Sequence, residues 1–211
     1  MQRIFHTPEG VRDIYSQECS RKQKLQEKLH RVFHQYGFED IETPTFEYFE
    51  VFSKEVGTIP SRELYKFFDR EGNTLVLRPD FTPSVSRACA TYFNPEKEVV
   101  SLCYTGNTFI NNSSFRGRLK ETTQMGVERM GDDSPEADAE ILAMTVECLL
   151  ATGLTEFQVS VGQVDYYKAI FAQTGMSQEE EEELRELISQ KNYFGVEELV
   201  KNKNMDKSLA R

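Results

Sequence analysis

The chain has 211 residues, a formal net charge of −10 at pH 7 and 38% hydrophobic residues. This length fits one domain or one domain plus part of another, and the hydrophobic content predicts a packed core. The acidic balance argues against a protein that mainly grips nucleic-acid backbone, which favours basic surfaces, and no stretch approaches the roughly 20 apolar residues of a membrane-spanning helix.

Helical spacing of apolar residues predicts a first helix from Ser16 to Tyr36. Gly37 follows it, and glycine suits the position just after a helix end. The segment 38–46 is then expected to be extended, with Pro44 suited to an edge or interface strand.

A short hairpin is predicted next, because residues 65–69 and 74–78 alternate around a turn at 70–73. The helix predicted over 82–93 carries Pro83 at its first turn. Two longer strands, 100–110 and 120–130, are expected to form a second hairpin around a polar loop.

The remaining elements are predicted mainly by their end signals. Ser134 and Pro135 begin a helix that should end before Gly153. A strand over 157–161, a helix over 164–173 and short polar helices over 178–190 and 194–202 follow.

Hairpins with helices between them predict an α+β fold, an antiparallel sheet flanked by helices. The more polar character after Gly175 predicts a core over 1–174 and the start of a helical insertion over 175–211.

The cysteines and histidines do not suggest a metal site or a cofactor. They comprise Cys19, Cys89, Cys103, Cys148, His6, His30 and His34. No C-x-x-C pair occurs, and the histidines do not complete a ligand spacing, so we expect reduced cysteines in a cytoplasmic protein.

Alternation along the 120–130 strand places Gln124, Gly126 and Glu128 on one face. The missing side chain at Gly126 predicts a gap that fits a small zwitterion, with Glu128 taking its ammonium group. Asp80 could supply a second carboxylate, and Arg118 could bind the ligand's carboxylate through both guanidinium nitrogens.

Several stretches together resemble class II aminoacyl-tRNA synthetases, the histidyl enzyme in particular. They are Thr7–Asp13, the 16–36 helix with Thr43–Glu47 (similar to motif 1, the dimer-interface element), Leu77–Thr82, the 107–128 hairpin (similar to motif 2) and Glu136–Glu140.

The resemblance also exposes two lost ATP-site positions. In the synthetase, an arginine of motif 2 binds the ATP α-phosphate, and a glutamate two residues later binds the adenine. The corresponding residues here are Ile110 and Asn112, so the resemblance implies that adenylation, and with it aminoacylation, is lost.

Two further features resemble the regulatory-subunit family of ATP phosphoribosyltransferase, the enzyme of the first step of histidine biosynthesis. Asp80-Phe81-Thr82 stands where the synthetase has Glu-Gly-Thr, and 190–199 is similar to that family's helical insertion. The resemblance implies a non-catalytic, homodimeric protein that supports a short-form catalytic subunit. It assigns a histidine pocket to Asp80, Thr82, Arg118, Gln124 and Glu128.

Two alternatives stay open. A divergent or truncated histidyl-tRNA synthetase would need another residue, such as Arg116, on the phosphate, and a free-standing amino-acid-binding scaffold would need no partner. Motif 3 and the last strands of the synthetase core have no counterpart before Arg211, so we expect a truncated core.

Overall fold

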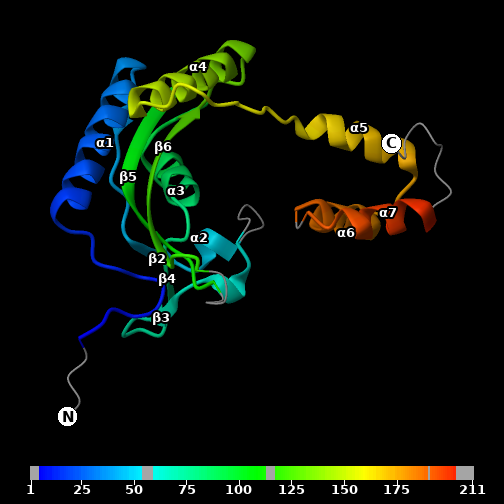
Figure 1. Ribbon diagram of the computed structural model, residues 1–211, viewed down its shortest axis with the longest axis horizontal. Helices are drawn as coiled ribbons and strands as arrows, with labels where there is room; N and C mark the ends of the chain where they lie inside the picture. Colours follow the sequence, from blue (N-terminus) through cyan, green and yellow to red (C-terminus); the bar gives the residue numbers. More distant parts are fainter. Residues whose placement is uncertain (1–4, 54–58, 113–116, 190, 203–211) are drawn as a thin grey trace. The chain divides into compact units, whose positions relative to one another are not determined.

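The computed structural model describes residues 5–53, 59–112, 117–189 and 191–202. The chain forms two compact units, Met1–Phe157 and Gln158–Arg211 (Figure 1). The division lies at Phe157, and the domain boundary expected after residue 174 stays a prediction.

The first unit contains two three-stranded sheets with helices around them. Its helices are α1 (Ser16–Gln35), α2 (Glu50–Ser53), the 3-10 turn η1 (Ser61–Glu63), α3 (Thr82–Tyr92) and α4 (Pro135–Thr152). Its strands are β1 (Glu39–Asp40), β2 (Phe46–Tyr48), β3 (Lys66–Phe68), β4 (Thr74–Leu77), β5 (Val100–Phe109) and β6 (Glu121–Met130).

The predicted long hairpin is confirmed, and it organises the first sheet. β5 and β6 pair antiparallel over their whole lengths, with Val100 opposite Met130 and Phe109 opposite Glu121. β1 lies on the other side of β5 and runs parallel to it, in the order β1-β5-β6. This parallel pair departs from an all-antiparallel sheet, because the whole second sheet and α3 lie between the two strands in the sequence.

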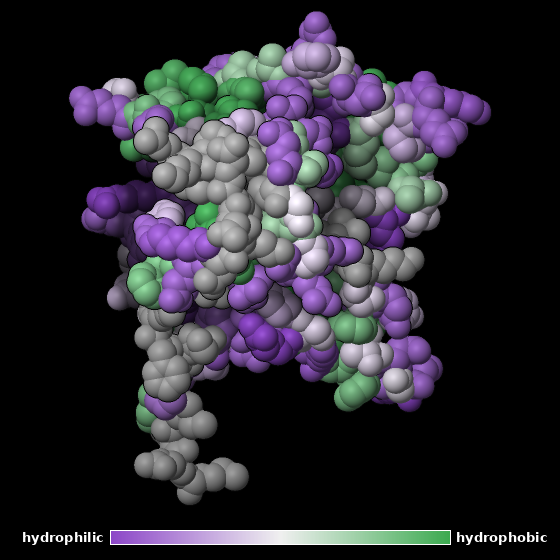
Figure 2. Space-filling view, turned by 90° about the vertical axis from the view of Figure 1, so that its right-hand side faces the viewer, coloured by the Kyte–Doolittle hydropathy of each residue, from purple (hydrophilic) through white to green (hydrophobic). Residues whose placement is uncertain are grey.

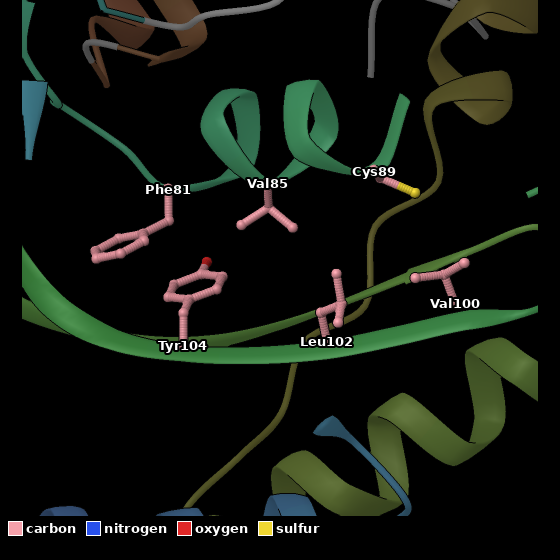
Figure 3. Packing of buried hydrophobic residues seen from close by; sticks show 6 residues of the cluster. All are labelled: Phe81, Val85, Cys89, Val100, Leu102 and Tyr104. Carbon is pink, nitrogen blue, oxygen red and sulfur yellow. The ribbon is translucent and has the colours of Figure 1, made fainter. Parts of the chain in front are cut away.

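One face of the first sheet packs against α3 (Figure 3). Leu102 and Tyr104 of β5 point toward Phe81 and Val85 at the start of α3, and all four side chains are at most 4% exposed. The Phe81 and Tyr104 rings stack with centroids 4.3 Å apart. Because successive strand residues alternate between faces, Cys103 lies on the opposite side.

That opposite face packs against α1 and α4, which lie together over it in Figure 1. Cys103 is fully buried there among Val32 and Phe33 of α1 and Met144 of α4. Burial raises the pKa of the Cys103 thiol to about 12, so it remains a thiol and donates to Asp40. The four cysteines are free; Cys89 and Cys103 are buried, whereas Cys19 and Cys148 are half-buried.

The second sheet has the order β2-β4-β3, with both neighbours antiparallel to β4. Its β3–β4 turn is the predicted one, and Gly72 there has φ +87°. The buried Glu47 of β2 accepts two hydrogen bonds from Arg87 of α3, at 2.7 and 3.1 Å, which ties this sheet to the helix.

Helix ends follow the predicted signals. Gly37 and Gly153 take positive φ angles after α1 and α4, and the Ser134 hydroxyl accepts from the Ala137 amide at the start of α4. The predicted extended segment over 38–46 is split between β1 and the first residue of β2, and Pro44 lies in the link between these strands.

The predicted strand over 157–161 is wrong. Residues 157–161 form no strand, and Phe157, Val159 and Val161 are 37%, 38% and 70% exposed. A strand requires a hydrogen-bonding neighbour, and none of the strands in the described part of the chain pairs with this segment.

The second unit consists of α5 (Val164–Thr174), α6 (Gln178–Ser189) and α7 (Tyr193–Asn202). Phe171 and Leu184 are buried, while Tyr193 and Phe194 are 67% and 73% exposed. The face of the molecule shown in Figure 2 carries hydrophobic residues interspersed among hydrophilic ones. Within the described ranges no helix is long and apolar enough to cross a membrane.

Candidate functional site

A cluster of polar side chains lies between the start of α3 and the middle of β5 and β6. We call it the carboxylate cluster, and it consists of Asp80, Thr82, Tyr104, Gln124 and Glu128. Four of its five members were predicted from the sequence. Gln124 and Glu128 share one face of β6, as their spacing predicted, and the structure shows that this face meets α3.

Hydrogen bonds join every member of the carboxylate cluster. Glu128 Oε1 accepts from the Thr82 hydroxyl at 2.7 Å and from the Tyr104 hydroxyl at 3.3 Å. Gln124 Nε2 donates to Asp80 Oδ1 and to the Tyr104 hydroxyl, each at 3.4 Å. Asp80 Oδ1 also accepts from the Phe81 amide at 2.7 Å, which fixes the carboxylate at the start of α3.

Tyr104 fills the gap that the sequence predicted over Gly126. The two residues are directly opposite each other in the hairpin, and a Cβ at Gly126 would lie 2.6 Å from Tyr104 Cζ. The predicted gap is therefore occupied by a phenol ring, because a cross-strand neighbour leans over the glycine. The prediction of space for a ligand directly over Gly126 is therefore wrong. The missing side chain at Gly126 makes space for the Tyr104 ring.

The carboxylate cluster holds more negative than positive charge. Burial raises the pKa of Glu128, and the nearby Asp80 charge raises it further, although the Thr82 and Tyr104 hydroxyls oppose the shift. Burial and the same two carboxylates raise the pKa of Tyr104, which stays a neutral donor. Within the described residues, Glu128 Oε2 and Asp80 Oδ2 accept no hydrogen bond and neither carboxylate has an ion-pair partner.

Arg78 lies beside the carboxylate cluster, but its guanidinium group hydrogen-bonds to backbone carbonyls. Its guanidinium donates to the carbonyls of Thr43 and Asn107, each at 2.8 Å, and lies 4.0 Å from the centre of the Phe81 ring. A Cβ at Gly106 would meet Arg78 Nη2 at 2.5 Å, so this glycine admits the arginine. Burial lowers the pKa of Arg78.

Sequence reasoning missed Tyr104. The available signal was its position in the strand: Tyr104 shares the face of Leu102, and that face meets α3. Its partner Gly126 could be identified only once the hairpin register was known.

Arg118 is not brought into the carboxylate cluster. Its side chain is exposed, and it makes no hydrogen bond or ion pair with any other residue the structure describes. Its role as the partner of a ligand carboxylate therefore stays a prediction.

Comparison with known proteins places the chain in a family. The family described as "Histidyl-tRNA synthetase" matches residues 10–211. The chain belongs to the histidyl-tRNA synthetase family. The predicted class II synthetase-like α+β core is confirmed by this match and by the structures it resembles.

The similar proteins also confirm the resemblance to regulatory subunits. A protein of Acetivibrio thermocellus named "ATP phosphoribosyltransferase regulatory subunit" is 43% identical over 97% of this chain and 49% of its own length. A protein of the same name from Ruminiclostridium cellulolyticum is 40% identical, with the same coverage. The chain spans about half the length of these relatives.

Two solved structures share the fold. A Bacillus halodurans structure described as "ATP phosphoribosyltransferase regulatory subunit/histidyl-tRNA synthetase" matches with a TM-score of 0.85 and 32% identity, over 100% of this chain and 54% of the other. A "Histidine--tRNA ligase subunit" from Alicyclobacillus acidocaldarius matches with a TM-score of 0.82 at 22% identity, over 98% of this chain and 60% of the other, which shows the fold alone.

Ile110 and Asn112, for which the resemblance predicted the loss of ATP-binding side chains, lie at the end of the hairpin. The Ile110 amide donates to the Lys120 carbonyl at 2.9 Å, and the Asn112 side-chain amide donates to the Leu119 carbonyl at 3.3 Å. Asn112 thus holds the two ends of the loop together. Arg116, which the synthetase alternative would need, lies outside the described residues.

A first prediction concerns the stability of the carboxylate cluster. Glu128→Gln should raise the melting temperature at pH 7 by about 2–4 °C, which corresponds to roughly 1 kcal/mol in a chain of this size. The charged carboxylate is desolvated beside Asp80, whereas the amide oxygen still accepts from Thr82 and Tyr104.

The stabilisation by Glu128→Gln should depend on pH. A pKa raised in the folded state contributes stability that is fully present below the unfolded glutamate pKa and is lost as the pH rises through the folded value. The difference in melting temperature should therefore close in acid. The exposed Glu27→Gln on α1 is the control, and an unchanged or lower melting temperature for Glu128→Gln at pH 7 would contradict the prediction.

Proposed function

We propose that the protein is a non-catalytic regulatory subunit of ATP phosphoribosyltransferase that binds histidine and a short-form catalytic subunit. The observation that supports the histidine site is a half-buried pair of carboxylates, each with an oxygen that accepts no hydrogen bond and with no cationic partner among the residues the structure describes. The names of the relatives support the regulatory role. Because the chain spans about half their length, the activity of the whole protein is part of the proposal.

Histidine's ammonium group matches the charge of the carboxylate cluster. Glu128 Oε2 and Asp80 Oδ2 are available acceptors, and an ammonium offers three donors. A bound cation would also relieve the repulsion between the Glu128 and Asp80 carboxylates. Ligand binding would therefore explain why a glutamate is kept in this partly buried position. Arg118 would meet the ligand's carboxylate, which requires the 117–120 segment to approach the carboxylate cluster.

Loss of adenylation fits the same proposal. Ile110 offers no charge to a phosphate, and Asn112 is held by the Leu119 carbonyl. Arg78 cannot replace the missing arginine without abandoning two backbone carbonyls at 2.8 Å, which would then be left buried.

We therefore expect no histidine-dependent ATP–pyrophosphate exchange from the purified protein. A charge-assisted phosphate contact is worth about 1.5–3 kcal/mol, and its loss would also remove stabilisation of the charged transition state. An active histidyl-tRNA synthetase serves as the positive control. Exchange above the no-enzyme background would favour the divergent-synthetase alternative instead.

Homodimer formation is part of the proposal. β2 is an edge strand on which Phe46 and Tyr48 are 51% and 53% exposed, and β3 at the other edge exposes Phe68 by 73%. Unpaired edges with exposed aromatic side chains favour association, and a two-fold dimer would bury the same patch on both subunits. The predicted dimer element, α1 with the segment through Pro44, leads directly into this edge.

A further inference from the structure

Four side chains of metal-ligand type meet where α1, β1 and β5 converge. They are His30 and His34 from the second half of α1, Asp40 from β1 and Cys103 from β5. One ligand atom of each lies within 4.8 Å of the others. This group is separate from the carboxylate cluster, because Cys103 and Tyr104 are consecutive on β5 and point to opposite faces.

The fold explains why these side chains meet. Residues four apart share a helix face, so His30 and His34 project together, and their ring centroids are 4.2 Å apart. Gly37 turns the chain from α1 into β1 with φ +78°. β1 then pairs in parallel with β5 so that Asp40 is directly opposite Cys103.

Asp40 is the centre of the group. Its Oδ1 contacts His30 Nε2 and accepts from the Cys103 thiol at 3.4 Å, while its Oδ2 lies 3.0 Å from His34 Nε2. Spacing alone did not predict a metal site here, because the ligands come from three elements. The four-residue separation of the histidines was the one signal in the sequence.

We propose that His30, His34, Asp40 and Cys103 bind a zinc ion. Two imidazoles, a carboxylate and a thiolate make a four-ligand donor set typical of tetrahedral zinc. With ligand bonds of about 2.0–2.3 Å, the ligand atoms of such a site lie roughly 3.3–3.8 Å apart.

Small side-chain rotations would reach this geometry. The His30, His34 and Asp40 side chains are 37%, 46% and 56% exposed, so they can adjust, whereas Cys103 is held in the core. Zinc would displace the thiol proton to solvent and replace the hydrogen bonds of Asp40 with metal bonds. With four protein ligands the ion would join α1 to the sheet as a structural site.

The test uses the purified, reduced protein, freed of metal with a chelator and titrated with zinc chloride by calorimetry. We expect one zinc ion per chain and a higher melting temperature with zinc. His34→Gln should weaken zinc binding by at least about 100-fold. Loss of a residue that only hydrogen-bonds to a metal ligand already lowers metal affinity by about 10–100-fold. The side chain of His34 is 46% exposed, so this variant should keep its fold.

Cobalt chloride gives a second measurement. Bound cobalt should produce a near-ultraviolet thiolate charge-transfer band that Cys103→Ala abolishes. His6→Ala and Cys148→Ala are the matched controls, and both should retain binding and the band. Absence of saturable zinc binding, or equal binding by His34→Gln and His6→Ala, would overturn the proposal. A cobalt band that survives Cys103→Ala would overturn it as well.

Discussion

Glu128→Ala is expected to weaken histidine binding by roughly 30- to 5,000-fold. Removing one partner of a buried charge pair commonly costs about 2–5 kcal/mol. The ligand's ammonium would lose the Glu128 carboxylate and retain only the half-buried Asp80. Calorimetry with histidine, on the protein alone and in complex with its catalytic partner, measures the change.

Glu128→Gln separates charge from shape in this experiment. It keeps both accepted hydrogen bonds and should still lose affinity, although we expect it to be more stable than the wild type without ligand. Glu27→Ala, exposed on α1, is the control. Unchanged affinity in both Glu128 variants would remove this residue from the histidine site.

The same charge gives binding a pH dependence. Since burial and Asp80 raise the pKa of Glu128, its carboxylate is protonated at a higher pH than an exposed glutamate. Histidine affinity should therefore fall as the pH decreases through that raised value. Glu128→Gln should lose this component of the pH dependence.

Mixing the purified protein with a short-form ATP phosphoribosyltransferase is expected to increase the formation of phosphoribosyl-ATP. No catalytic residue need come from this chain, because it would act by holding the partner in its active arrangement. Histidine would change that arrangement through different affinities for the two states. If the activity of the catalytic subunit does not change at any mixing ratio, the regulatory-subunit proposal is wrong and the scaffold alternative is favoured.

Thermodynamic linkage supplies an independent check on the assembly. If histidine changes the affinity between the two subunits, the catalytic subunit must change the affinity for histidine by the same factor, typically about 5- to 150-fold. Calorimetry in both directions tests this equality. Glu128→Gln should shift the histidine effect to higher histidine concentrations, whereas Glu27→Gln should leave it unchanged.

Local sequence signals predicted most elements of the fold. The residues just past the ends of α1 and α4, the turn at Gly72 and the two strands of the long hairpin lie where they were expected. Each depends on a conformational preference of a few adjacent residues. The 157–161 segment has the alternation of a strand, but a strand also needs a pairing partner, and the local pattern carries no information about one.

The sequence by itself determined the face that Gln124 and Glu128 share, since strand alternation needs no tertiary information. It also determined that the side chain at position 110, an isoleucine, is uncharged. Only the tertiary structure decided that Tyr104 occupies the space over Gly126, because that depends on which residue of β5 is opposite the glycine. The meeting of His30 and His34 with Asp40 and Cys103 likewise requires the parallel β1–β5 register, a contact between residues more than 60 positions apart.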